Sequence, residues 1–168
     1  LIHFHGHEPV RKELVKTARG IFLVGIDLGI GSGAYSSAFA SPTVFPTLLA
    51  SIERAVAEHA GRKKARIRNL GLSSWSAGYG AIEQILRQPA GSKVDALILL
   101  DSVHAGYADD GGKALKKPQL EPFVAFARKA AAGQKLMFMS HSSIVPPGYA
   151  STTETANYIV SQLRGKPR

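Results

Sequence analysis

The chain has 168 residues, of which 45% are hydrophobic and 20% charged, and these proportions indicate a globular domain with a core and exclude wholesale disorder. The absence of cysteine excludes disulfides, thiolate catalysis and cysteine metal sites, and it leaves open whether the protein is cytoplasmic or secreted. A formal charge of +9 is compatible with attraction to an anionic surface or polymer, but solvated basic loops are the simpler interpretation.

Apolar runs alternate with stretches of helical spacing along the whole chain. In the first half, the pattern predicts strands over residues 1–5 and 21–26, helices over residues 8–19 and 47–60, and a long loop rich in Gly, Ser, Ala and Pro over residues 27–46. In the second half, it predicts a strand that turns directly into a helix within residues 66–86, strands over residues 94–100 and 135–139, a polar loop over residues 102–120, and helices over residues 121–132 and 153–163. This order predicts a single α/β domain over residues 1–168, with a mostly parallel sheet of about five strands and helices on both faces.

The N-terminus starts directly in a strand pattern, LIHFHG, without an initiator methionine or a signal-peptide pattern. We therefore expect the chain to be trimmed at its N-terminus relative to the native protein. No apolar run approaches the ~20 residues of a membrane-spanning helix, so no membrane span is expected.

Chemically active residue types follow the predicted strands. Because ligands bind at the carboxyl ends of parallel strands, these residues are expected to share one edge of the sheet. In chain order, the residues at the strand ends are His5-Gly6-His7, Asp27, Ser74–Gly78, Asp101 and Ser140-His141. Serine, aspartate and histidine are the residue types of acyl-transfer chemistry, so this edge is the expected active site.

Ser76 is the candidate nucleophile. It lies in the stretch SWSAG, where the predicted strand turns into the predicted helix, and such a turn exposes a serine hydroxyl above the sheet. The usual pattern is G-x-S-x-G, and here Ser74 takes the first glycine position while Gly78 takes the second. The alternative is an ordinary strand-to-helix turn in which Ser76 only caps the helix.

Asp101 and His141 are the candidate acid and base. Asp101 ends the strand after Ser76 and would support a histidine that becomes charged during catalysis. His141 follows the last strand, and histidine is the residue type suited to proton transfer near neutral pH. His104 is the rival base, and otherwise we expect it to line the pocket. For each, a structural role in a loop is the alternative.

Two places in the sequence are candidate sources of the hydrogen-bond donors that would hold an oxyanion. One donor is the backbone N–H of Ala77, which follows the nucleophile, and the other comes from Gly6 and His7. Because His3, His5 and His7 alternate, an extended strand would place them on one side, which is also compatible with a metal site. The nearby glycine and the downstream serine favour the oxyanion interpretation.

At this point the sequence resembles the α/β-hydrolase fold. The matching stretches are HFHGH, SWSAG, LILLD with Asp101 and MFMSH with His141, in the family's order of serine, acid and histidine. The resemblance implies a minimal three-layer α/β sandwich and a serine esterase or lipase-like hydrolase, which cleaves a carboxylic ester, thioester or amide through an acyl-enzyme on Ser76. It also implies that no cofactor or metal is needed. In this chain the acid follows the first strand after Ser76 and the histidine follows the second, whereas in much of the family each comes one strand later. The predicted sheet, with about five strands, is also smaller than is usual in the family.

The substrate pocket is expected among aromatic residues near the strand ends, with ordinary packing as the alternative. These residues, with the rival histidine, are Tyr35, Trp75, His104, Tyr107 and Tyr149. The expected substrate is a small-molecule or polymeric ester whose identity the sequence does not specify, and the oligomeric state also stays open.

Two other functions compete with hydrolysis. The stretch from Gly29 to Ala34 fits the dinucleotide-binding pattern G-x-G-x-x-A, although Asp27 and Leu28 separate it from the strand; the simpler interpretation is a flexible wall of the active-site cleft. The second alternative is a non-catalytic α/β module that binds an anionic polymer or a nucleotide through its basic loops.

Overall fold

The computed structural model describes residues 1–108 and 114–163, and its centre is one sheet of five strands. The strands are β1 (Ile2–Phe4), β2 (Val24–Ile26), β3 (Gly71–Ser76), β4 (Ala96–Ser102) and β5 (Leu136–Ser140). The helices are α1 (His7–Thr17), α2 (Ser32–Phe39), α3 (Val44–His59), α4 (Tyr79–Arg87), α5 (Lys117–Ala131) and α6 (Thr152–Ser161), with the short 3-10 helix η1 (Pro89–Lys93) after α4. All neighbouring strands are parallel, which confirms the predicted α/β fold with about five strands.

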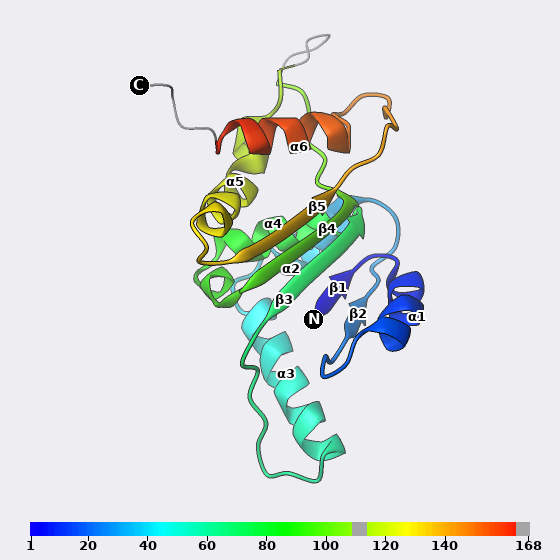
Figure 1. Ribbon diagram of the computed structural model, residues 1–168, viewed down its shortest axis with the longest axis vertical. Coiled ribbons are helices and arrows are strands. Elements are labelled where there is room, and N and C mark those ends of the chain that lie inside the picture. The colour runs from blue at the N-terminus through cyan, green and yellow to red at the C-terminus, as the bar shows by residue number, and fades with distance from the viewer. Residues whose placement is uncertain (109–113, 164–168) are drawn as a thin grey trace.

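The sheet separates two layers of helices. Successive side chains of a strand point to opposite faces, so Phe4, Leu72 and Leu99 face one side and are fully buried there. They form a core with apolar residues of α4 and α5, among them Ile82, Ile85, Leu120 and Phe123. On the other face, α1 lies beside β1 and β2 (Figure 1). This arrangement agrees with a three-layer α/β fold.

The strand order indicates where on the sheet the candidate functional site lies. The order is β2-β1-β3-β4-β5, so the chain leaves β1 toward one edge of the sheet and leaves β3 toward the other. In doubly wound sheets of this order, ligands bind where the direction changes, outside the carboxyl ends of the strands. Here the loops that follow β1 and β3 meet at that point, and they carry His5, Gly6 and Ser76.

The predicted loop over residues 27–46 differs most from the structure. It contains α2 and the first residues of α3, which begins at Val44. The sequence of α2, SGAYSSAF, has only two large apolar residues, Tyr35 and Phe39, and therefore gives a weak periodic signal. Both are buried, and the ring of Phe39 meets the edge of Phe4 at a centroid distance of 5.2 Å. Tertiary packing therefore stabilises a helix that the amino-acid composition of this segment does not indicate.

The predicted polar loop over residues 102–120 is shorter than expected, because α5 begins at Lys117 with a proline in its first turn. The part of this loop over residues 109–113, with Asp109, Asp110 and Lys113, lies outside the described residues, as does the basic tail over residues 164–168. Within the two described ranges, no helix is long and apolar enough to cross a membrane.

Candidate active site

Ser76 lies at the apex of a tight turn between β3 and α4. Its φ is +44°, in the left-handed region, which costs a residue other than glycine about 1–2 kcal/mol. The turn also brings β1 close to the start of α4, because a Cβ at Gly78 would lie 2.2 Å from the carbonyl oxygen of Phe4. A left-handed serine held against the neighbouring strand is the geometry that a nucleophile elbow requires.

The serine at the first glycine position of the motif takes part in a hydroxyl chain. Ser74 is fully buried, and its Oγ lies 2.8 Å from Oγ of Ser102 on β4. Ser102 donates its proton to the carbonyl oxygen of Ser76, also over 2.8 Å. Ser74 must therefore be the donor to Ser102, and the departure from the glycine pattern links the elbow to β4.

Two hydrogen-bonding groups at the turn have no partner among the described residues. Neither the hydroxyl of Ser76 nor the backbone N–H of Ala77 makes a hydrogen bond with any described part of the chain. Ser76 is only partly buried. A hydroxyl and an N–H that are adjacent and unpaired are the pair that can attack a carbonyl and hold the resulting oxyanion.

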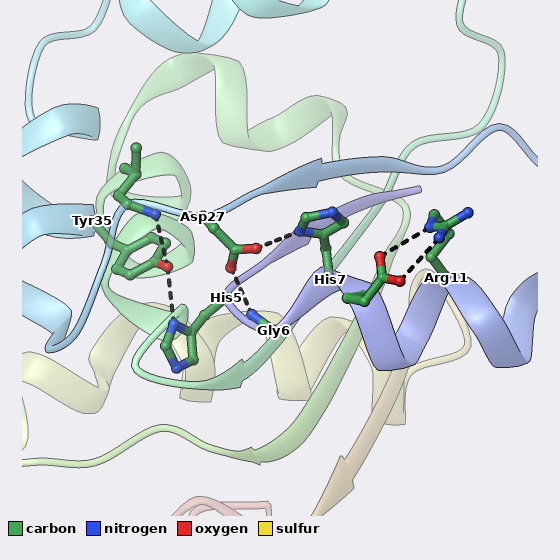
Figure 2. Close-up of polar contacts among 8 residues, drawn as sticks. His5, Gly6, His7, Arg11, Asp27 and Tyr35 are labelled. Carbon is green, nitrogen blue, oxygen red and sulfur yellow. Dashed lines mark hydrogen bonds and ion pairs between the residues drawn. The ribbon is translucent and has the colours of Figure 1, made fainter.

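The loop after β1 directs its donors to Asp27 instead. The N–H of Gly6 donates to Oδ1 of Asp27 over 2.7 Å, and Nδ1 of His7 donates to Oδ2 of the same carboxylate (Figure 2). Burial raises the pKa of Asp27, but these contacts lower it more, so the pKa lies below its ordinary value. An ionised Asp27 therefore accepts hydrogen bonds from the loop that the sequence predicted to hold the oxyanion. Of the predicted oxyanion donors, the N–H of Ala77 is the one without a partner among the described residues.

His5 and Tyr35 form a second polar contact beside this loop. The hydroxyl oxygen of Tyr35 accepts a hydrogen bond from the N–H of Leu28 over 3.0 Å and lies 3.0 Å from Nδ1 of His5 (Figure 2). The imidazole of His5 also lies beside Trp75, with ring centroids 5.9 Å apart. Tyr35 is fully buried, so it fixes the loops around Ser76 and does not form an open pocket wall.

Asp101 is held at the end of β4 by the chain after β5. Its Oδ1 accepts hydrogen bonds from Oγ1 of Thr152 over 2.6 Å and from the N–H of Ser142 over 2.9 Å. Burial raises the pKa of Asp101, but the hydrogen bonds from Thr152 and Ser142, with a smaller effect of His104, lower it more. The carboxylate is therefore ionised at neutral pH, and it binds the residue next to His141.

The imidazole of His141 is exposed and is oriented by Thr153. The hydroxyl of Thr153 donates to the carbonyl oxygen of Ser142 over 2.7 Å, so Nδ1 of His141 is the donor in its 2.9 Å contact with Thr153. This leaves Nε2 as a free proton acceptor. Across the described ranges, however, no hydrogen bond joins Ser76, Asp101 and His141 to one another.

His104 lies deeper than His141. Its Nδ1 donates to the carbonyl oxygen of Ala150 over 3.0 Å, and because a carbonyl only accepts, Nε2 again carries the free lone pair. Its ring meets those of Tyr79 and Tyr149 edge-on, at centroid distances of 5.9 and 5.1 Å. Tyr79 is the first residue of α4, directly after the elbow, so His104 lies on the side of Ser76.

The remaining predicted pocket residues divide into two groups. Trp75 and Tyr149 are exposed at the strand ends, as a pocket wall requires. Tyr107 instead donates its hydroxyl to the carboxylate of Glu154 over 3.0 Å, which is a structural contact. The sequence did not predict Thr152 and Ser142 as partners of Asp101; Ser142 lies just after β5, and Thr152 is the first residue of α6.

The three alternating histidines do not converge. His3 is fully buried and contacts Oγ of Ser73 over 2.7 Å, whereas His5 and His7 contact Tyr35 and Asp27. His5 has a φ of +68°, which ends the alternation of the strand. In the part of the chain that the structure describes, no group of three or more His, Asp or Glu side chains is placed to hold a metal ion.

Comparison with known proteins gives no match: no family model, no curated protein and no solved structure matches the chain. The class that the fold defines is a doubly wound parallel α/β protein with a strained serine at its topological switch point.

Proposed function

We propose that the protein is a serine hydrolase that cleaves carboxylic esters through an acyl-enzyme on Ser76. The observation that carries the proposal is the left-handed serine at the β3–α4 turn, with its hydroxyl and the N–H of Ala77 both unpaired among the residues that the structure describes. Strain of this kind persists only where the surrounding structure enforces it, and it is concentrated at functional sites.

In the proposed reaction, Ser76 attacks the ester carbonyl while a histidine takes its proton, and the N–H of Ala77 donates to the oxyanion. The histidine then gives the proton to the departing alcohol. A water molecule, activated by the same imidazole, attacks the acyl-enzyme and releases the acid and Ser76.

Of the two histidines, His104 is the base that we propose, in place of His141 as the sequence predicted. Both have a free Nε2, but His104 is half-buried next to the first residue of α4, whereas His141 faces solvent. Asp101 lies close enough to His104 for the histidine to contribute to the lowered pKa of the carboxyl, so the proposed acid lies near the proposed base. Asp101 also holds the loop that carries His141.

Labelling with a fluorophosphonate tests the proposal, because the reagent reacts only with activated serines. We expect one label per chain on the peptide that contains Ser76, and none in Ser76→Ala. Ser37→Ala, at an exposed position on α2, is the matched control and should label like the wild type. A folded wild-type protein that does not label would overturn the proposal.

A second candidate function, binding of an anionic polymer, is supported by one observation. Five exposed cations follow α3, and none of them forms an ion pair with a described residue. These residues, here called the basic tip, are Arg62, Lys63, Lys64, Arg66 and Arg68. Figure 1 places the chain after α3 at the end of the molecule opposite the arrowheads of β4 and β5, so binding there would leave the candidate active site free.

A further inference from the structure

Several exposed apolar side chains lie on the segments that follow the strands, at the end of the sheet that carries Ser76. In the described ranges, 13 large apolar residues are exposed, and 6 of them lie on three segments at the strand ends. These six residues, here called the apolar rim, are Leu28, Ile30, Trp75, Ile144, Val145 and Tyr149. Ile30 is 99% exposed and Val145 is 78% exposed, so both lie entirely outside the core.

The rim is attached to the elbow on both sides. On one side, the N–H of Leu28 donates to the hydroxyl of Tyr35, which contacts His5, and the ring of His5 lies beside Trp75. On the other side, the ring of Tyr149 meets His104 edge-on, 5.1 Å between centroids. The backbone of Leu28 and the rings of Trp75 and Tyr149 are therefore connected to the residues around Ser76 by specific contacts.

The rim is uncharged in a strongly basic protein. The chain has 21 lysines and arginines, but none lies in residues 28–31 or 142–149. A neutral hydrocarbon group can therefore lie on these residues without desolvating a lysine or arginine.

The surface beside Ser76 reaches solvent: Ser76 is partly buried, and the side chains of Trp75 and Tyr149 are 45% and 44% exposed. One cavity of about 470 Å³ lies between α5, β5 and α6, and another of about 380 Å³ lies under α1. Neither is lined by Ser76, Asp101 or His104. The exposed apolar side chains of the rim are therefore accessible to an elongated hydrocarbon group.

We propose that the apolar rim binds the hydrocarbon chain of the substrate, so that the substrate class is a neutral ester with a long, unbranched alkyl or acyl chain. This inference rests on the proposed function of Ser76. Full burial of a methylene gives roughly a fourfold gain in binding. An open surface covers about half of the chain, so each added methylene should increase kcat/KM roughly twofold.

The kinetic test compares p-nitrophenyl esters from acetate to dodecanoate below their micellar concentrations. We expect kcat/KM to rise with chain length in the wild type. Ile30→Asn and Val145→Asn should each lower the ratio of dodecanoate to acetate activity roughly 3- to 10-fold. Val15→Asn, at a 67% exposed position on α1, is the matched control and should keep the wild-type ratio. A ratio that stays the same in both rim variants would overturn the inference.

A binding measurement does not require hydrolysis. Trp75 is the only tryptophan in the chain, and it lies in the rim 45% exposed, so its emission reports directly on this surface. In Ser76→Ala, decyl acetate should shift the emission to shorter wavelength in a saturable way, and Val145→Asn should weaken this response.

The two measurements separate the two proposals. A saturable shift without any hydrolysis that depends on Ser76 would support the rim and overturn the catalytic proposal. Hydrolysis that depends on Ser76, without chain-length preference or shift, would support catalysis and overturn the rim. If neither is observed, both proposals fail.

Discussion

Ser76 on β3 pairs with Ser102 on β4, although Trp75 pairs with Leu100, so the ladder passes over Asp101. Both Ser76 and Asp101 have left-handed φ angles, +44° and +43°. A bulge of this kind bends the strand and redirects a side chain. Here the carboxylate of Asp101 points toward the chain after β5, where Ser142 and Thr152 donate to it. The turn at Ser76 and the position of the Asp101 carboxylate therefore lie at the same irregularity of the β3–β4 ladder.

The hydroxyl of Ser102 should be needed for the geometry of the elbow. In Ser102→Ala, the carbonyl of Ser76 and the hydroxyl of Ser74 lose their shared partner. We expect a loss of about 1–3 kcal/mol in the free energy of unfolding, measured by urea titration. The rate of fluorophosphonate labelling should fall roughly tenfold, because the nucleophile is no longer held in position. Labelling at the wild-type rate would show that the hydroxyl chain is only structural.

The contact between Gly78 and β1 should make alanine intolerable at this position. Its φ of −62° suits any residue, so the cost of Gly78→Ala comes only from the 2.2 Å approach of the new Cβ to the carbonyl of Phe4. We expect a loss of about 3 kcal/mol or more, or failure to fold.

Gly33→Ala is the matched control for this variant. Gly33 lies in the first turn of α2, near a helix start as Gly78 is, and a Cβ there would meet nothing within 4 Å. It should stabilise the protein by about 0.4–1 kcal/mol, because alanine loses less conformational entropy on folding. Equal effects of the two substitutions would contradict the close packing of the elbow.

Burial of His3 should make the protein less stable in mild acid. Its side chain is fully buried, Nδ1 contacts Ser73, and Nε2 has no partner among the described residues. Burial lowers the pKa of His3 below its ordinary value of 6.5, against smaller opposing effects that include a contact with the backbone of His5 and the charge of Asp27. The unfolded chain therefore binds a proton that the folded chain does not, so stability is full above about pH 6.5 and decreases as the pH falls below it.

The measurement is the free energy of unfolding between pH 7.5 and 5 for the wild type and His3→Gln, buffered in steps of about half a unit. The wild-type curve should decline with falling pH, and His3→Gln should remove part of this slope. His59→Gln, at an exposed position at the end of α3, should leave the slope unchanged. Parallel curves for wild type and His3→Gln would exclude His3 as the source.

The sequence was sufficient where the structure depends on local pattern. The turn at Ser76 could be predicted because an apolar run, a small-residue turn and a helical segment follow one another directly. The contact of Gly6 and His7 with Asp27 could not, since it joins residues about 20 positions apart and exists only because β2 is the neighbour of β1. The prediction that the carboxyl ends of the strands lie at one end of the sheet agrees with the parallel backbone arrangement. The hydrogen-bond partners of Asp101 could not be predicted, because its orientation depends on a β-bulge that no sequence pattern indicates.

The choice between the two histidines can be tested directly. His104→Gln should lower the labelling rate of Ser76 at least about 100-fold, the size of a lost general base. His141→Gln should lower it less than about tenfold, because its imidazole faces solvent and acts only through the loop that Asp101 holds. Circular dichroism would confirm that both variants are folded. The reverse order of effects would restore His141 as the base.

The basic tip should bind anionic polymers independently of Ser76. A triple variant with Arg62, Lys64 and Arg66 replaced by Glu removes unpaired cations from one exposed segment. Its control replaces Lys93, Arg128 and Lys129 by Glu, which changes the net charge equally but at exposed positions elsewhere. On immobilised duplex DNA, the tip variant should elute at much lower salt than the control, because the affinity depends on local phosphate contacts and the counterions they release. Equal shifts in the two variants would mean that retention reflects only net charge, and Ser76→Ala should elute with the wild type in either case.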